Sequence, residues 1–401
     1  MTLPGRKPRI AYVRGSYLNP FEAQYLEPLQ DRFDLTVAYP RSHRYDVSGI
    51  RLPRIELPCL DYLNGLIPRT VGSLRVPNPL KHLGIDECLF GLEPVLSGAD
   101  VLHVAEQSFY STYQVAVRKR RHRFRLITLQ DEINPLWYAG FGNAAKRAQC
   151  VRDNTDLFIA RTERARSALL CEGVEPDRIR VIGHGVDTER FSPGPRPAQL
   201  AHKYGISPDR LVILLVGRLV WEKGIYTLAD AVRLLLAGMP AGAARPLFVI
   251  VGEGEERGGL ERRLALLGIG EYVRLLGNLP YPLLPEVHRL ADIFVLPSIA
   301  TRLVLEQFGI VLIEAMATGK PIVATRCGAI DEVVGDAGVL VQPNDYYRLC
   351  EALRSLIADA ALRERLGRAA LERVTSRFRK QHITAMISQA YDDVLALPPV
   401  A

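Results

Sequence analysis

Four charged residues are spaced so that they could bind phosphate and hydroxyl groups. Glu306 and Glu314 stand eight positions apart, with Phe-Gly between them. Arg218 and Lys223 follow the apolar run 211–217, between 83 and 88 residues earlier (306 − 223 = 83; 306 − 218 = 88). At the end of a strand, a guanidinium and an ammonium group can bind a diphosphate, the first as a planar fork and the second as a point charge. Taken alone, the two cations would also fit an ordinary solvated loop.

The segment 310–319 has the pattern of a helix that begins just after Gly309. The backbone N–H groups of Gly309, Ile310 and Val311 would be free at its start, where the helix dipole helps to bind an anion. Glu314 would lie one turn further along the same face, about 6 Å away. If a diphosphate binds at the helix start, this carboxylate could accept hydrogen bonds from both ribose hydroxyls. The alternative is a surface carboxylate on an amphipathic helix.

Short apolar, β-branched runs alternate with helical patterns along the whole chain. Continuous apolar strands separated by helices indicate parallel sheets covered on both faces. Two such series indicate an α/β protein with two doubly wound, Rossmann-like domains facing a cleft. The default ligand site is this cleft between them, beyond the carboxyl ends of the strands. The predicted strands are 9–13, 35–39, 100–105, 125–130, 156–160 and 179–183 in the first series, and 211–217, 247–252, 273–277, 292–297, 321–325 and 338–342 in the second.

The join between the two series is visible in the composition. The segment 191–199 carries three prolines and a glycine, as linkers do. We therefore expect a first domain at 1–190 and a second at 191–375. Residues 376–401 have a helical pattern with no strand after it, so we expect them to return to the first domain and pack there.

The composition allows an anionic partner without identifying it. The formal net charge of +7 suits a phosphate-bearing substrate, a membrane face or a nucleic acid, and simple solubility would explain it equally well. The six cysteines are widely spaced without a CxxC pair, so neither a zinc site nor a disulfide framework is indicated. The N-terminal segment lacks the apolar region of a signal peptide, and the apolar runs are too short to span a bilayer. We expect a reduced, cytoplasmic setting.

A basic run at 118–125 holds six Lys or Arg in eight residues. A solvated turn would explain it. The functional alternative is peripheral contact with an anionic membrane surface, where each basic residue adds about 1 kcal/mol. A nucleic-acid partner is not expected, because the run has a single aromatic residue and no recognition module accompanies it.

The second half of the chain resembles the donor-binding half of retaining glycosyltransferases of the GT-B fold. More narrowly, it resembles glycosyltransferase family four, the glycosyl transferases group one set. The resemblance rests on the motifs GRLVWEKG (217–224), VGEGEE (251–256) and VLPSIATRLVLEQFGIVLIEAMATGKPIVAT (295–325), with its Glu-x7-Glu spacing. It covers about 155–375 well and the first half of the chain weakly.

The resemblance implies roles for these residues. Arg218 and Lys223 would bind the donor diphosphate and stabilise it as it leaves. Glu306 would hold the donor sugar, and Glu314 would bind the ribose. The remaining donor contacts would be Phe308, Gly309, Ile310 and Val311 at the sugar and phosphates, and Gly277 and Asn278 near the base. The family needs no metal, and no DxD motif stands at a strand end here, so we expect neither a metal nor another cofactor, with fixed cations doing the same electrostatic work.

The first half of the chain departs from the family pattern. After the first strand the family often has a paired glycine, where this chain has Gly15 followed by Ser16, which could still pass the donor phosphates. After the strand 100–105 many members carry two histidines, of which His103 is the counterpart of the first. Glu106 is then the better acceptor-side candidate, and His103 is either an acceptor contact or a buried structural histidine.

Two more residues are acceptor-side candidates. Asp131 lies in the strand-end loop TLQDEINPLWY (128–138), where carboxylates beside aromatic rings suit a sugar or another polar acceptor. An ordinary polar loop is the equal alternative. His184, in VIGHGVD, stands where the family usually has Asn.

These features predict a retaining, metal-independent glycosyltransferase of polysaccharide or glycolipid biosynthesis. It would move a sugar from a nucleotide-sugar donor to a hydroxyl of a glycan, a lipid-linked or a small-molecule acceptor. The alternatives are another GT-B nucleotide-sugar enzyme, such as an epimerase or phosphorylase, and a non-catalytic protein that binds nucleotides or carbohydrates. The base, the sugar and the acceptor are left open.

Overall fold

The computed structural model describes residues 6–43, 45–60, 70–71, 74–75, 87–140, 142–301 and 304–400. The chain forms two compact units, the first made of 1–185 with 380–401 and the second of 186–379. The expected end of the first domain, residue 190, lies five residues after the observed one (190 − 185 = 5). The expected end of the second domain, residue 375, lies four residues before the observed one (379 − 375 = 4). The proline-rich segment after Phe191 lies inside the second unit, and Phe191 itself is fully buried there.

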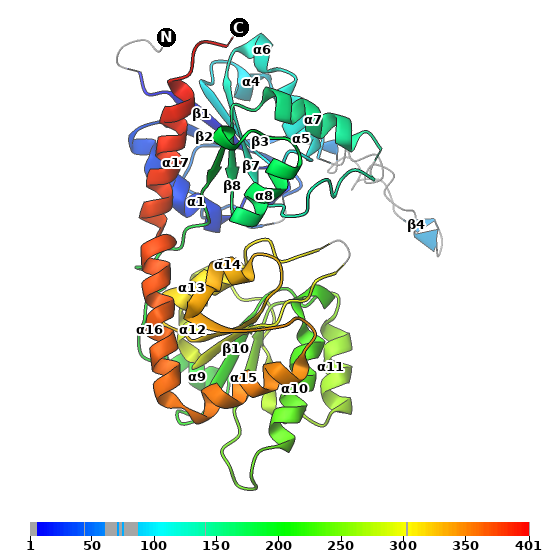
Figure 1. Ribbon diagram of the computed structural model, residues 1–401, viewed down its shortest axis with the longest axis vertical. Coiled ribbons are helices and arrows are strands. Elements are labelled where there is room, and N and C mark those ends of the chain that lie inside the picture. The colour runs from blue at the N-terminus through cyan, green and yellow to red at the C-terminus, as the bar shows by residue number, and fades with distance from the viewer. Residues whose placement is uncertain are drawn as a thin grey trace. The chain divides into compact units, whose positions relative to one another are not determined.

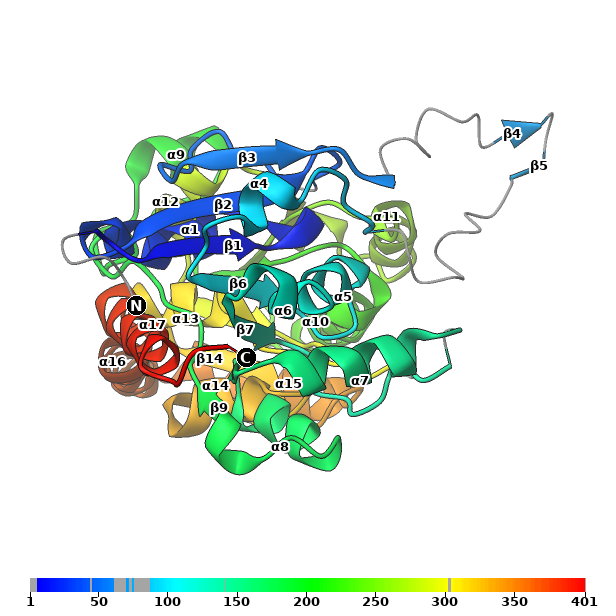
Figure 2. The same cartoon turned by 90° about the horizontal axis from the view of Figure 1, so that it is seen from above.

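The first unit, in which Figure 1 labels β1, β2, β3, β7 and β8, is built on a parallel sheet of seven strands in the order β3-β2-β1-β6-β7-β8-β9. Figure 2 shows β3, β2, β1 and β6 side by side. All residues of β6 and β8 are buried, as expected for strands covered on both faces. The strands are β1 (Arg9–Val13), β2 (Asp34–Pro40), β3 (Arg54–Leu57), β6 (Val101–Ala105), β7 (Arg125–Gln130), β8 (Leu157–Ala160) and β9 (Ile179–Val181), with a separate antiparallel pair β4 (Thr70–Val71) and β5 (Leu74–Arg75).

Helices follow most of these strands. The α-helices of the first unit are α1 (Pro20–Leu26), α4 (Glu93–Leu96), α5 (Tyr110–Ala116), α6 (Lys119–His122), α7 (Ala144–Asn154), α8 (Glu163–Cys171) and α17 (Lys380–Leu395), and its 3₁₀ turns are η1 (Gly15–Tyr17), η2 (Glu27–Asp31) and η3 (Pro176–Arg178). Helix α1 begins at a cap in which Asn19 accepts a hydrogen bond from the Glu22 N–H, with a proline at the first helical position.

The second unit is built on a parallel sheet of six strands in the order β12-β11-β10-β13-β14-β15. Its strands are β10 (Val212–Val216), β11 (Leu247–Val251), β12 (Val273–Leu275), β13 (Ile293–Leu296), β14 (Ile322–Thr325) and β15 (Gly338–Val341). Its helices are α9 (Ala198–Lys203), α10 (Ile225–Ala237), α11 (Arg257–Leu266), α12 (Leu284–Leu290), α13 (Ile310–Ala317), α14 (Ile330–Val334), α15 (Tyr346–Ala358) and α16 (Ala360–Arg377), with 3₁₀ turns η4 (Trp221–Lys223), η5 (Gly270–Tyr272), η6 (Tyr281–Leu283) and η7 (Gly335–Ala337). The expectation of two doubly wound domains is confirmed.

The C-terminal helix α17 returns to the first unit, as expected. It packs on α1, and its Tyr391 hydroxyl shares a hydrogen bond of 2.9 Å with Nδ1 of His103 on β6. Thr384 donates to the carbonyl oxygen of Tyr25 at 2.7 Å. The edge of the Tyr391 ring meets the Phe33 ring, with 5.3 Å between the centroids. Residues at the two ends of the chain therefore share one core.

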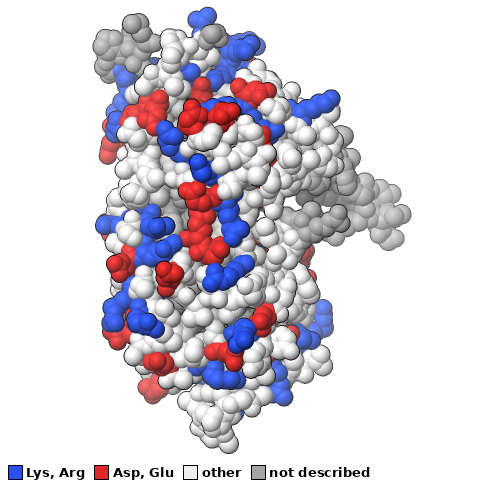
Figure 3. Space-filling view, viewed as in Figure 1, with Lys and Arg blue, Asp and Glu red and all other residues white. Residues whose placement is uncertain are grey.

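The surface shows no single-sign field on the face seen in Figure 3, where Lys and Arg are interspersed with Asp and Glu. All six cysteines are free thiols. Within the described ranges, none of the helices combines the length and the apolar character that crossing a membrane requires.

Candidate functional site

In the second unit, glycines fix the loop that follows β10. Gly224 has a φ of +66°, and a Cβ there would collide with the carbonyl oxygen of Pro297 after β13. Gly252, after β11, has a φ of +137°, and a Cβ there would collide with the carbonyl oxygen of Gly217. The Leu219 N–H donates to the carbonyl oxygen of Glu253 at 2.9 Å. The loops that end three neighbouring strands are thus held in close backbone contact, which glycine alone permits.

This arrangement brings together Lys223, Ser298 and Glu306. The Nζ of Lys223 lies 2.6 Å from Oε2 of Glu306, and the Ser298 hydroxyl donates to the same oxygen at 2.8 Å. Both charged side chains are mostly buried. Burial by itself raises the pKa of Glu306, but the charge and hydrogen bond of Lys223, and then Ser298, outweigh it and hold this pKa below its ordinary value. Glu306 is therefore an ionised, oriented carboxylate.

Arg218, the second predicted cation, is not part of this ion pair, although its charge also lowers the pKa of Glu306. Its side chain is 66% exposed and its Nη2 is 3.5 Å from the Glu222 carboxylate. A guanidinium with so little packing can turn toward a ligand at little cost, whereas the Lys223 ammonium is already fixed.

The backbone of Glu306 is supported by a loop that the sequence analysis did not single out. Gly328 has a φ of +58°, and a Cβ there would collide with the Glu306 carbonyl oxygen. The Ala329 N–H donates to that oxygen at 2.8 Å. The Thr325 hydroxyl, at the end of β14, donates to the carbonyl oxygen of Ser298. The signal that could have indicated Ser298 and Gly328 is their position one and three residues after predicted strands (298 − 297 = 1; 328 − 325 = 3).

The helix start next to Glu306 has the predicted form. Helix α13 begins at Ile310, and Gly309 occupies its N-cap with a φ of +79° and no side chain to cap the helix. Ile310 and Val311 are half-buried. The Phe308 ring is buried against the Phe378 ring, with 5.7 Å between the centroids, and its place at the sugar and phosphates stays a prediction.

Glu314 is a buried carboxylate rather than a residue on the surface of an amphipathic helix. It is 2% exposed, and its Oε2 lies 3.7 Å from Nε2 of His288 on α12. His288 is itself fully buried between the rings of Phe191 and Phe294. Burial, and then the Glu314 carboxylate, raises the pKa of Tyr281 well above its usual range. Glu314 therefore belongs to a buried polar group that includes His288 and Tyr281.

The predicted base contacts lie at the end of β12. Gly277 has a φ of +71°, and its carbonyl oxygen accepts a hydrogen bond of 2.9 Å from the Gly252 N–H. Asn278 is exposed. The strands β12, β11, β10 and β13 are consecutive in the sheet. The predicted donor residues of this unit follow the carboxyl ends of β12, β10 and β13 or lie on α13.

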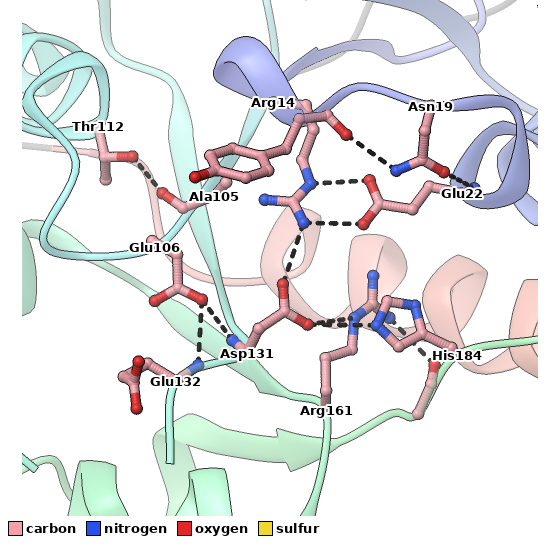
Figure 4. A network of polar contacts seen from close by, with 12 residues as sticks. Arg14, Asn19, Glu22, Ala105, Glu106, Thr112, Asp131, Glu132, Arg161 and His184 are labelled. Carbon is pink, nitrogen blue, oxygen red and sulfur yellow. Dashed lines mark hydrogen bonds and ion pairs between the residues drawn. The ribbon is translucent and has the colours of Figure 1, made fainter. Parts of the chain in front are cut away.

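The first unit contains a buried ionic network (Figure 4). Arg14, after β1, binds both carboxylate oxygens of Glu22 at 2.7 and 2.8 Å, and its Nη2 lies 3.0 Å from Asp131, after β7. Asp131 also lies 3.3 Å from Nε2 of His184 and 3.8 Å from Arg161. The network holds two guanidiniums and two carboxylates, so its charges balance, as buried ions require.

The electrostatics of this network fix the protonation of Asp131. Burial raises its pKa, but the hydrogen bond of His184 and the charges of Arg14 and Arg161 outweigh burial and hold the pKa well below its usual range. Burial, followed by Arg161, lowers the pKa of His184, which is therefore neutral. Glu22, Asp131 and His184 each offer a ligand atom within 4.8 Å of the others, but the cations that neutralise them are the two arginines.

The loop that carries Asp131 is anchored at its far end by Glu172. The Glu172 carboxylate accepts hydrogen bonds from the Leu136 N–H at 2.7 Å, the Tyr138 hydroxyl at 3.0 Å and Arg152 at 3.1 Å. Burial, followed by Glu172, raises the pKa of Tyr138 to about 12. Of the two aromatic residues that end the segment 128–138, Tyr138 is buried and Trp137 is 41% exposed.

Two N-terminal candidates have structural partners. His103 is 1% exposed, bonded to Tyr391, and burial holds its pKa well below its usual value, so it is the buried histidine of the two predicted alternatives. The Ser16 hydroxyl donates to Glu87 at 2.7 Å, and a Cβ on Gly15 would lie 2.9 Å from the same carboxylate. A phosphate at Gly15 and Ser16 would meet that carboxylate, which disfavours the predicted passage for donor phosphates.

Residues 198–373 match the family model described as glycosyl transferases group 1. This stretch makes up most of the second unit, which is therefore similar to glycosyl transferases group 1 domains. Among curated proteins, D-inositol 3-phosphate glycosyltransferase 1 of Catenulispora acidiphila is 36% identical over 225 residues, 54% of this chain and 52% of that protein. The enzyme of Corynebacterium jeikeium is 36% identical over 262 residues, 63% of this chain and 60% of that protein. The chain thus spans about half the length of the curated relatives it matches.

Solved structures share the fold over nearly the whole chain. Anabaena HepE in complex with UDP aligns with a TM-score of 0.75 and 21% identity, covering 96% of this chain and all of that one. Sucrose-phosphate synthase from Thermosynechococcus elongatus aligns with a TM-score of 0.72 and 21% identity, covering 97% and 99%. Together with the two Rossmann-like units, these neighbours identify the fold as GT-B.

Proposed function

We propose that this protein is a retaining, metal-independent glycosyltransferase that moves a sugar from a nucleotide-sugar donor to a hydroxyl of a glycan, lipid-linked or small-molecule acceptor. The observation that carries the proposal is the Lys223–Glu306 pair, 2.6 Å apart and joined by Ser298, beside the start of α13. A fixed cation and a helix N-terminus together favour a diphosphate. An ionised carboxylate next to them suits the hydroxyls of the attached sugar.

The donor would bind along one edge of the second sheet. Its diphosphate would lie against Lys223, the exposed guanidinium of Arg218 and the N–H groups at the start of α13. Glu306 would accept hydrogen bonds from the sugar, and the polar group of Glu314 would bind the ribose. Support comes from the family match of this domain and from HepE, a fold relative solved with UDP and with UDP-glucose.

In the reaction, the bond between the anomeric carbon and the diphosphate oxygen breaks, and the acceptor hydroxyl oxygen bonds to that carbon on the same face. The acceptor proton passes to the departing phosphate oxygen. Lys223 and the α13 N-terminus stabilise the charge that develops on the diphosphate. Glu306, ionised and already paired, is a poor proton donor, and its role is to orient the sugar. Removing one such stabilising group typically lowers kcat by about 10²–10³-fold.

The decisive experiment combines binding with product analysis. Thermal shifts with UDP-, GDP-, ADP- and dTDP-sugars identify the base, because a ligand that binds the folded state raises the apparent stability. The binding donor is then incubated with acceptors, beginning with inositol 3-phosphate, which the names of the curated relatives suggest. A product of donor sugar plus acceptor, with its anomeric configuration retained and formed in the presence of EDTA, supports the proposal.

The same experiment separates the alternatives. An epimerase changes the sugar of the donor without using an acceptor, and a phosphorylase requires inorganic phosphate. Tight donor binding with neither transfer nor slow hydrolysis indicates a non-catalytic binding protein. Each of these outcomes would overturn the proposal.

A further inference from the structure

Glu106 occupies an unusual place at the carboxyl end of β6. Its backbone φ is +27°, a left-handed conformation that non-glycine residues adopt rarely and mostly where the surroundings hold them. The residue is 6% exposed. Its carbonyl oxygen accepts a hydrogen bond of 3.1 Å from the Phe109 N–H, which leads the chain into α5. The backbone of Glu106 is therefore held in place where the chain turns from β6 toward α5.

The Glu106 carboxyl group binds the loop that follows β7. Its Oε1 accepts hydrogen bonds from two successive backbone N–H groups, those of Asp131 at 2.6 Å and Glu132 at 3.1 Å (Figure 4). Its Oε2 is buried without a hydrogen-bond partner among the described residues. One oxygen thus holds the end of a neighbouring strand, and the other is withdrawn from water.

The charges around Glu106 oppose its ionisation. Asp131 remains ionised because Arg14, Arg161 and His184 face its carboxylate, so a second buried negative charge beside it is repelled. Burial is the largest cause that raises the pKa of Glu106, followed by the charge of Asp131. Burial, Asp131 and Glu132 outweigh the backbone hydrogen bond and the Arg14 charge, which lower this pKa, and raise it to about 8. Near neutral pH this carboxyl group carries a proton.

We propose that Glu106 is a positioning residue that works as a neutral acid, clasping the Asp131–Glu132 backbone and thereby aiming the Asp131 carboxylate into its network with Arg14, Arg161 and His184. Loss of the proton places a second negative charge beside Asp131 in a buried site, and this repulsion opposes the backbone hydrogen bonds that Glu106 accepts. The first unit then has a pH-dependent link between β6 and the loop after β7.

The test exploits the similarity of glutamine to protonated glutamic acid. Glu106→Gln keeps a carbonyl oxygen for the two N–H groups and stays neutral at every pH. The raised pKa stabilises the wild-type fold below the ordinary glutamate pKa, and this stabilisation is lost as the pH rises toward 8. The Tm of Glu106→Gln minus that of the wild type should therefore increase by a few degrees between pH 5 and 8 and level off above. The exposed Glu175→Gln serves as the control, with a constant difference.

Parallel Tm curves for the wild type and Glu106→Gln between pH 5 and 9 would overturn the proposal. Glu106→Ala, which removes the accepting oxygen, should lower the Tm at every pH and should not be rescued by acid. If Glu106→Ala fails to fold, the pH dependence of the Tm difference between Glu106→Gln and the wild type still tests the proposal.

The kinetic arm rests on the proposed function and on the first unit binding the acceptor. The acceptor KM of the wild type should rise above about pH 8, whereas that of Glu106→Gln should stay flat and the donor KM should change equally in both. An acceptor KM that follows the same pH curve in both proteins contradicts the positioning role. If no transfer is detected at all, the proposed function fails while the Tm comparison still tests the clasp.

Discussion

The Nζ of Lys223 lies 2.6 Å from Oε2 of Glu306, although 83 residues separate them in the chain (306 − 223 = 83). Lys223 ends the turn after β10 and Glu306 precedes α13, so the contact depends on two neighbouring strands, β10 and β13. The pair fixes both side chains before any ligand arrives. Such preorganisation avoids rearrangement when charge develops on a leaving group.

Removing the Lys223 charge should abolish most turnover. We expect Lys223→Ala to lower kcat by about 10²–10³-fold, the usual effect of deleting one group that stabilises the transition state. The measurement is nucleoside diphosphate release with the donor and acceptor found above. Lys203→Ala, an exposed lysine on α9, is the matched control, and equal kcat values for the two variants would exclude a role for Lys223 in the reaction.

The same pair predicts a pH dependence of stability. Because the pKa of Glu306 is lowered in the folded protein, its ionised form stabilises the fold above the ordinary glutamate pKa, and this is lost as the pH falls through the lowered value. Lys223→Met removes the compensating charge from a buried carboxylate. We expect its Tm deficit relative to the wild type to be larger at pH 7 than at pH 4, as followed by thermal unfolding. A Tm deficit of the same size at both pH values would contradict this.

Glu314 offers a test of the ribose site. A hydrogen bond to a charged group contributes about 1.5–3 kcal/mol, so Glu314→Gln should weaken nucleoside diphosphate binding roughly tenfold or more in calorimetry. His288→Gln, at the residue 3.7 Å away, should weaken it less, because it alters the position of the carboxylate without removing it. Unchanged affinity together with a lowered Tm would assign Glu314 to the core alone.

Two glycines with nearly equal φ angles allow the cost of backbone strain to be measured separately from the cost of a steric clash at Cβ. Gly224 has a φ of +66° and Gly268 one of +65°, but only at Gly224 would a Cβ meet another atom within 4 Å, the Pro297 carbonyl oxygen first. Gly268→Ala should cost about 1 kcal/mol of stability. Gly224→Ala should cost clearly more, and urea unfolding measures both. Equal losses would show that the loops after β10 and β13 can move apart freely.

The basic run divides into structural and exposed residues. Lys119 and Arg125 both pair with Asp156, at 2.7 and 3.2 Å, whereas Arg120, Arg121 and Arg123 are exposed. If this run contacts an anionic membrane, replacing the three exposed arginines with Gln should weaken vesicle binding by about 1 kcal/mol per residue. Co-sedimentation with acidic liposomes at two salt concentrations measures this. Equal binding of the wild type to acidic and neutral liposomes would end the membrane hypothesis.

Much of the fold could be predicted because buried parallel strands have a strong sequence pattern. All twelve predicted strands are present, with their ends shifted by at most two residues. The edge strand β3 was not predicted, because its sequence, RIEL, carries two charges and three of its four residues are incompletely buried. The short pair β4 and β5 was missed as well, since two residues per strand give no measurable period.

The candidate site was less predictable than the fold. Spacing placed Lys223 and Glu306 at neighbouring strand ends, where loop position decides the contact. It could not place His288 beside Glu314, which depends on how α12 packs against α13, or join Arg14 to Asp131, 117 residues away. Nor did it distinguish Phe308 as a core residue, since an aromatic residue before a helix start can face either way.

Because α17 shares a core with β6 and α1, the first unit is interrupted in the chain by the second. Residues 186–379 are continuous and leave the ribosome before the helix that completes the first unit. The second unit can therefore finish folding during translation while the first waits for Tyr391 to reach His103. The order of maturation would then be the reverse of the usual one, in which the N-terminal domain folds first.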